Sequence, residues 1–209
     1  RIMIKFLKKL FDSVFNREVL FNSSIIDGLT KNYVLNLEKF EKDWMSGDGT
    51  SDYTNGVNYE WLSPESVKLV NEEIHITSKH NPKTIENNRY ENQTGMVTSI
   101  RFFFHGYYEL LVDLPKVSTH IPTIELFNPD GNIELVCGNN KVSKIGFIYL
   151  PNRIEIYHDD ILVKKIKGGD IGYQVKMKIK NGLNPSVEGT RINDEESLIL
   201  NGLTFYRKK

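Results

Sequence analysis

The chain has 209 residues, with 27 basic and 27 acidic side chains, so its net charge at neutral pH is zero and exerts no overall attraction on nucleic acid. An apolar share of 39% suits a single folded domain with its own core. The single cysteine excludes an internal disulfide, and the absence of an apolar run long enough for a membrane span excludes a transmembrane helix.

The first patterned segment is residues 1–17, where apolar residues recur at helical spacing and lysines take the opposite face. The pattern predicts a basic amphipathic helix over residues 1–20, followed by a connecting segment over residues 21–39. Such a helix binds a membrane surface or a groove of a partner protein, or it packs against its own domain, and the sequence leaves these alternatives open. It is not a secretory signal, because lysines interrupt its apolar stretch, so the localisation stays unknown.

From residue 40 to residue 209 the pattern changes to short apolar alternations between turn signals, with no long helix between them. Examples are "EIHITSK", "GYYELLVDLP", "PTIELF", "NIELVC", "KIGFIYL" and "YQVKMKIK". Regularly spaced strands of this kind predict an all-β protein, an antiparallel β-sandwich. Asp159-Asp160 marks one hairpin turn. Asn128 to Gly131 marks another, in which we expect Gly131 to take a left-handed conformation.

The strand at residues 132–137 contains the sequence's most informative side chains. Alternation places Asn132, Glu134 and Val136 on one face of this strand and Ile133, Leu135 and Cys137 on the other. The second set is apolar and is expected to face a core. The surroundings of Glu134 therefore decide whether the strand has a chemical role.

Several segments, taken in order, resemble family-16 glycoside hydrolases, the laminarinase and β-glucanase group. They are "VNYEWLSPESVKLVNEEIHITSK", "GMVTSIRFFFHGYYELLVDLPK", "NRIEIYHDDILVKKI" and "SLILNGLTFYRKK". The similarity covers residues 40–209 and implies a concanavalin A-like jelly roll. It also implies a function in binding or cleaving a polysaccharide.

The resemblance also identifies where the family's catalytic acids would stand. It places Asn132 at the position of the nucleophile, Glu134 at that of the assisting aspartate, and Cys137, or Val136 without a bulge, at that of the acid/base. Asparagine cannot form a glycosyl ester, and a buried thiol is no proton donor to a glycosidic oxygen. The sequence therefore favours a protein that is not an enzyme, without catalytic residues. No cofactor is expected, and the histidines lack zinc-ligand spacing.

A non-catalytic carbohydrate-binding module is the first hypothesis. Its candidate ligand-binding residues are aromatic and polar side chains on or near the strands that correspond to the family's sugar-facing strands. They are Glu134, Glu125, Tyr107, Glu109, Tyr157 and His158. We expect at least two aromatic residues from these strands to line one groove, drawn from Tyr107, Tyr108, Tyr149, Tyr157, Trp61 or His158.

Two alternatives remain. One is a structural or assembly protein, for example of a phage particle or surface complex, that docks through residues 1–17. The other is a glycosidase with displaced acids, drawn from Glu109, Asp113, Glu125 and Glu134.

Overall fold

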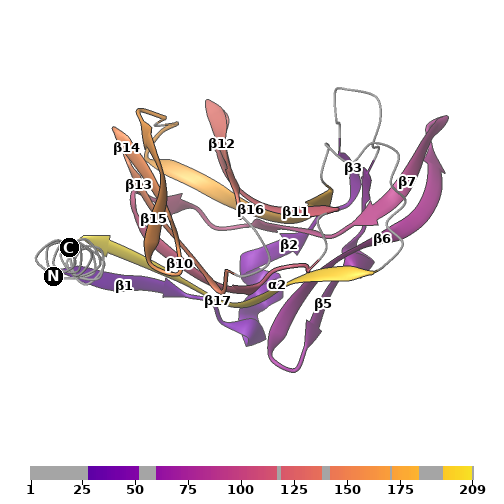
Figure 1. Ribbon diagram of the computed structural model, residues 1–209, viewed down its shortest axis with the longest axis horizontal. Helices are drawn as coiled ribbons and strands as arrows, with labels where there is room; N and C mark the ends of the chain where they lie inside the picture. The colour runs from indigo at the N-terminus through magenta and orange to yellow at the C-terminus, as the bar shows by residue number, and fades with distance from the viewer. Residues whose placement is uncertain are drawn as a thin grey trace, which may run out of the picture.

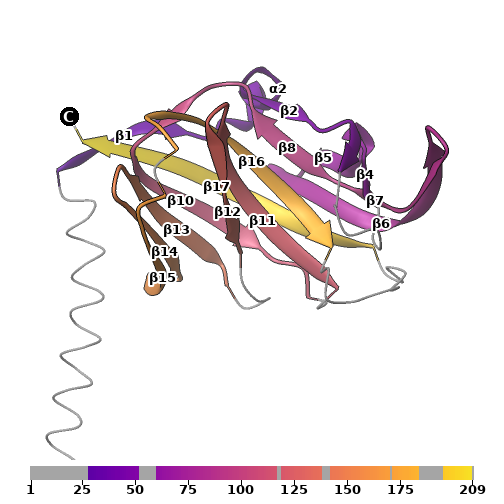
Figure 2. The same ribbon diagram turned by 90° about the horizontal axis from the view of Figure 1, so that it is seen from above.

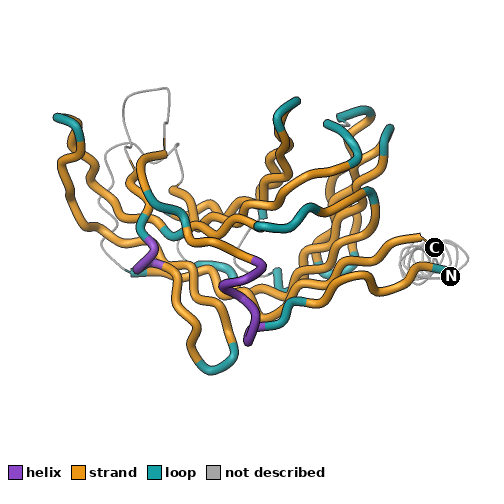
Figure 3. Tube along the Cα trace, turned by 180° about the vertical axis from the view of Figure 1, so that it is seen from behind, coloured by secondary structure: helices purple, strands orange, loops and turns teal. Residues whose placement is uncertain are grey.

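The computed structural model describes residues 28–51, 60–116, 119–137, 142–169, 171–183 and 195–208. The predicted helix over residues 1–20 lies outside the described residues. Within the described ranges, β-strand accounts for nearly all of the regular structure and helix is confined to short segments (Figure 3). In these ranges no helix has the length and apolar character needed to cross a bilayer.

Strands follow one another along the chain with only short helical turns between them. The strands are β1 Leu29–Val34, β2 Trp44–Ser46, β3 Gly49–Ser51, β4 Glu60–Leu62, β5 Val67–Val70, β6 Glu73–Ile85, β7 Asn88–Thr94, β8 Met96–Ser99, β9 Phe103–Phe104, β10 Gly106–Asp113, β11 His120–Asn128, β12 Gly131–Val136, β13 Lys144–Leu150, β14 Arg153–His158, β15 Ile161–Lys167, β16 Gln174–Leu183 and β17 Glu196–Lys208. The helical turns are η1 Leu37–Lys39, α2 Phe40–Asp43 and η2 Pro64–Ser66.

Both hairpins expected from the turn signals are present. Asp159 and Asp160 join β14 to β15 with φ values of 46° and 70°, the left-handed pair that matches the twist of two-residue hairpins. The second turn joins β11 to β12, and the Asn128 side chain accepts a hydrogen bond from the Asp130 N–H at 2.9 Å. Because this side chain closes the turn, Gly131 is not left-handed as expected but begins β12.

The described strands form two sheets, which confirms the predicted antiparallel β-sandwich. The larger sheet has the order β15-β14-β13-β10-β17-β6-β7-β4-β3, with β1 beside β17 and β5 beside β6. The smaller has the order β12-β11-β16-β8-β2, with β9 beside β16. Figure 1 shows β11 and β16 above β10 and β17, and Figure 2 shows the smaller sheet's strands side by side from above. β1 lies within the segment predicted as a connection.

The aromatic residues are concentrated between the two sheets. Phe103 makes edge contacts with Tyr108 and Phe205 at centroid distances of 5.8 and 6.0 Å, and Tyr108 stacks on Phe147 at 4.5 Å. All four rings are buried. These contacts add to the area that the rings bury. The abundance of Phe and Tyr in the sequence thus serves the core to a large extent.

Candidate functional site

Strand β12 runs in regular register beside β11. The pairing continues from Asn128 opposite Gly131 to Thr123 opposite Val136 without a shift, and the Cys137 N–H then donates to the Pro122 carbonyl at 3.0 Å. Side chains in an unshifted strand alternate strictly between faces. Asn132 and Glu134 are accordingly exposed, and Cys137 points into the core.

Cys137 has no access to a substrate. Its side chain belongs to the main core cluster, only 2% of the residue is exposed, and burial raises the pKa of its thiol to about 12. A thiol in this state is neither a nucleophile nor a proton donor near neutral pH. The unshifted register selects Val136, the other position that the resemblance offers for the acid/base, and valine has no ionisable group. Neither position therefore supplies a proton donor.

The face that contains Asn132 and Glu134 points away from the larger sheet, and we call it the open face. Pairing across β12, β11, β16 and β8 assigns its residues: Asn132, Glu134, Thr123, Glu125, Phe127, Lys176, Lys178, Lys180, Met96 and Thr98. These strands lie toward the viewer in Figure 2. The open face is thus a mixed surface of amide, carboxylate, ammonium and aromatic groups.

Glu125 lies at the centre of a small polar network on the open face. One of its carboxylate oxygens accepts a hydrogen bond from the Asn132 side-chain amide at 2.8 Å, and the other pairs with the Lys178 ammonium at 2.6 Å. That ammonium also lies 4.9 Å from the centre of the Phe127 ring. Both oxygens of Glu125 are therefore engaged, and its side chain is held in one orientation.

Glu134 stands directly opposite Glu125 in the register of β11 and β12. Side chains at facing positions of antiparallel strands are close neighbours, so two carboxylates from adjacent strands share this part of the open face. Glu134 is the exposed member of the pair and Glu125 the networked one. Glu134 can accept hydrogen bonds from hydroxyl groups of a ligand, whereas both oxygens of Glu125 already have partners.

Lys180 has a structural role at the edge of the open face. Its ammonium pairs with the carboxylate of Glu60, a residue with no exposed surface. The same carboxylate accepts a hydrogen bond from the Leu183 N–H at 2.6 Å. Removing one member of such a pair leaves a charge buried without compensation, so the pair fixes the β4 edge against β16.

The six predicted ligand-binding residues do not lie together. Glu125 and Glu134 lie on the open face, whereas Tyr107, Glu109 and Tyr157 lie on the outer face of the larger sheet. Tyr107 and Tyr157 are 1% and 3% exposed, in a cluster with Ile148 and Tyr206.

The side chains of Tyr157 and His158 are both turned toward the protein. The Tyr157 hydroxyl donates to the Glu155 carboxylate at 2.8 Å. His158 shares the inward face of β14 with Ile154 and Ile156, and burial lowers its pKa. Neither side chain is available to a ligand in this arrangement.

The aromatic residues expected to line a groove are buried as well. Tyr108 and Tyr149 have no exposed surface, and the Trp61 indole, 8% exposed as a residue, donates to the Asn81 carbonyl at 2.7 Å. The aromatic residues near the open face are instead Phe127 and Phe102, the latter 49% exposed. Phe127 was detectable from the sequence, because it lies two residues from Glu125 and alternation puts both on one face.

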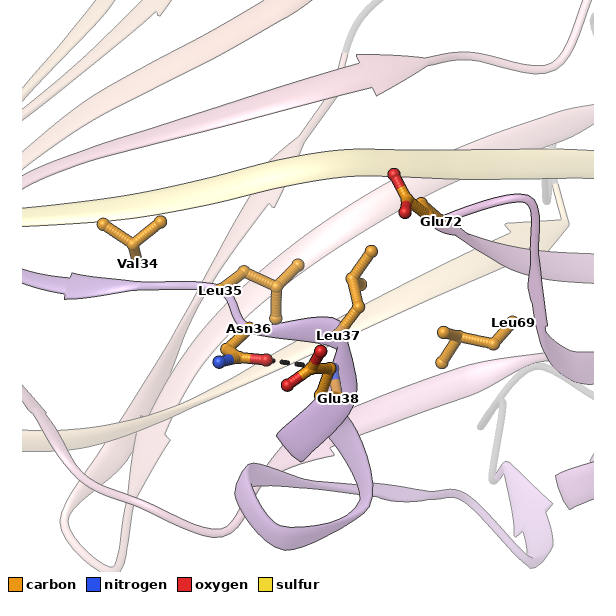
Figure 4. Close-up of a pocket in the computed structure, with 7 residues that line it drawn as sticks. All are labelled: Val34, Leu35, Asn36, Leu37, Glu38, Leu69 and Glu72. Atoms are coloured by element: carbon orange, nitrogen blue, oxygen red, sulfur yellow. Dashed lines mark hydrogen bonds between the residues drawn. The ribbon is translucent and has the colours of Figure 1, made fainter.

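Two hollows lie away from the open face. The hollow in Figure 4 is lined by Val34, Leu35, Asn36, Leu37, Glu38, Leu69 and Glu72, and the Asn36 side chain there caps η1 by accepting from the Glu38 N–H at 2.9 Å. The second lies beside His75, Asp113 and Glu196. Among the described residues, no group of three or more His, Cys, Asp or Glu side chains is arranged to hold a metal ion.

Comparison with solved structures identifies the fold. The catalytic domain of an endo-1,3-β-glucanase (laminarinase) from Thermotoga petrophila superposes with a TM-score of 0.69 at 10% identity, over 87% of this chain and 98% of the other. A family-16 endo-β-1,3(4)-glucanase gives 0.70 at 10% identity over 88% and 93%, and the κ-carrageenase of Pseudoalteromonas carrageenovora gives 0.60 at 11% over 87% and 97%. No protein-family model and no curated protein sequence matches the chain.

Proposed function

We propose that this protein, which has the jelly-roll fold of family-16 glycoside hydrolases, binds a glycan on its open face without hydrolysing it. The observation that carries the proposal is that β12 lacks the two catalytic carboxyl groups at the positions where the resemblance expects them. Asn132 stands where the resemblance expects a nucleophile, and the two positions that it offers for the acid/base are Val136 and the buried Cys137. A retaining glycosidase needs both carboxyl groups, about 5–5.5 Å apart, and neither assigned position supplies one.

The open face supplies the groups that sugar binding requires. Phe127 and the exposed Phe102 offer ring faces to the C–H side of a sugar, as aromatic residues do in binding sites. Glu134 is exposed and available to hydroxyl groups, while Glu125 is held in place by Lys178 and by the exposed Asn132. A partly preorganised polar network reduces the entropy lost when a ligand binds.

A binding measurement combined with an activity measurement tests the proposal. The full chain would be titrated with laminarin, mixed-linkage glucan, agarose and carrageenan by calorimetry, and reducing ends would be followed in parallel over long incubations. We expect binding to at least one polysaccharide with no release of reducing ends. Phe127→Ala should weaken the binding about tenfold, the loss expected for one stacking contact.

The control is Leu69→Ala, because Leu69 is an exposed apolar residue on β5, which lies on the other side of the larger sheet from β11 and β16 (Figure 1). Equal losses in both variants, or no binding to any glycan, would contradict the proposal. Release of reducing ends that disappears in Glu134→Gln would instead identify Glu134 and Glu125 as a displaced catalytic pair. The alternative of docking through residues 1–17 stays a prediction, to be tested by removing those residues and measuring assembly.

A further inference from the structure

Lys176 is the only one of the three open-face lysines on β16 without an acidic partner among the described residues. Lys178 pairs with Glu125 at 2.6 Å, and Lys180 pairs with the buried Glu60. Lys176 is partly buried, and its ammonium lies 5.5 Å from the centre of the Phe102 ring. A cation–π contact at this distance orients the ammonium but does not neutralise its charge.

The neighbours of Lys176 form one row across the sheet. Phe127 pairs with Asn132 on one side and with Lys176 on the other, and Phe102 precedes Phe103, which pairs with Val175. The row therefore reads Asn132, Phe127, Lys176, Phe102. An unpaired cation is set between two aromatic side chains, with an exposed amide at the end of the row.

The adjacent row has the opposite character. It contains Glu134, Glu125 and Lys178, side by side in the register of the same strands. Two carboxylates against one ammonium leave this row with an excess of negative charge. A ligand lying across both rows would meet a cation in one row and hydrogen-bond acceptors in the other.

We propose that the open face selects a glycan with an anionic substituent, a sulfate ester or a carboxylate, and that Lys176 binds this substituent. The inference rests on the proposed glycan binding and names the class of glycan. The sugar rings stack on Phe127 and Phe102, and their hydroxyl groups face Glu134. The anionic group pairs with Lys176, whose charge is otherwise uncompensated within the described residues.

A single-stranded nucleic acid is the other polymer that combines anionic groups with stacking rings. The observations favour the glycan, because Glu134 and Glu125 lie beside the row and would repel a backbone that carries one phosphate per nucleotide. A glycan with spaced anionic groups can avoid these carboxylates. Oligothymidylate is therefore included in the test as a competing ligand.

The experiment uses the full chain and two matched pairs of polysaccharides. One pair is κ-carrageenan and its chemically desulfated form, and the other is polygalacturonate and its methyl ester, so the two sources of negative charge are distinguished. Laminarin serves as a neutral reference. Affinities are measured at low and high salt, since a contact with a partly exposed lysine weakens as salt screens it.

We expect one anionic member to bind about tenfold more tightly than its neutral form, as one charge-assisted hydrogen bond would give. Lys176→Met should abolish this difference while leaving the affinity for the neutral form within about twofold, and Lys176→Arg should retain it. Lys68→Met is the control, because Lys68 is exposed on β5, on the other side of the larger sheet from β11 and β16 (Figure 1). Unchanged thermal unfolding would show that the variants are folded.

The outcomes separate the two proposals. Equal affinities for charged and neutral forms would overturn the role of Lys176 and leave glycan binding in place. Binding to none of the polysaccharides would overturn both proposals. Oligothymidylate binding that is tighter than that of every polysaccharide and is lost in Lys176→Met would replace the glycan with a nucleic acid.

Discussion

The open face of the smaller sheet and the outer face of the larger sheet contain the same kinds of side chain in opposite states. On the outer face the tyrosines Tyr107, Tyr157 and Tyr206 are buried in a cluster, and Glu155, 1% exposed, pairs with Lys165. On the open face Phe102, Asn132 and Glu134 are exposed. Composition alone does not distinguish a binding surface from a structural one. What distinguishes them is whether each aromatic or polar group is already covered by, or bonded to, its neighbours.

The prediction with the largest expected effect tests which side chains of β12 point into the core. Cys137→Glu would place a carboxylate in the core without a partner, and we expect a loss of about 3–5 kcal/mol in the free energy of unfolding, or no folded protein at all. Denaturant titration measures it. Glu134→Gln, on the exposed side of the same strand, is the control and should change the free energy by less than about 0.5 kcal/mol. Similar losses in both would contradict the assigned faces.

The second prediction compares aromatic residues of the two faces. Tyr157→Ala removes a ring from the outer cluster and leaves a cavity, so we expect about 3 kcal/mol of destabilisation. Phe102→Ala removes a ring that is 49% exposed and should leave the free energy of unfolding nearly unchanged. Thermal or denaturant unfolding of both variants measures the contrast. If Phe102→Ala were the more destabilising change, the open face would be part of the core.

The third prediction concerns the pH dependence due to Glu155. Burial alone would raise the pKa of Glu155, but hydrogen bonds from Lys165 and Tyr157 and the charge of Arg153 lower it below its ordinary value of 4.5. The resulting stability is fully present above this value and is lost as the pH falls through the folded-state pKa. Glu155→Gln should flatten this acid-side decline and cost about 1–2 kcal/mol at neutral pH. An unchanged acid-side decline would argue against the pairing.

The smallest effect is expected from a thiol reagent. Because Cys137 is buried and its pKa is raised to about 12, the folded protein should not react with a disulfide reagent, whereas the protein in denaturant should react fully. Absorbance of the released thiolate measures the extent. Rapid reaction of the folded protein would show that Cys137 is accessible to solvent. It would then contradict the argument that burial prevents Cys137 from acting as an acid/base.

The sequence predicted those features that depend on residues close together in the chain. The turn at Asp159-Asp160 and the shared face of Asn132 and Glu134 followed from residue order, because both depend on near neighbours in the chain. The burial of Tyr107 and Tyr157 did not follow. It depends on β10, β13, β14 and β17 lying side by side, and the pairing of β10 with β17 joins residues about a hundred positions apart. The role proposed for Lys176 could not be predicted from the sequence for the same reason, since its lack of an acidic partner among the described residues appears only once the strands are assembled.

The unshifted pairing of β11 and β12 has a consequence for any attempt to give this protein hydrolytic activity. Asn132→Glu would supply one carboxylate on the accessible side, and the other would have to come from position 136, which alternation puts on the same face, because position 137 points into the core. One residue inserted between Leu135 and Cys137 would reverse that direction. Position 137 could therefore supply a catalytic group only in a longer chain, whereas positions 132 and 136 could be substituted in the present one.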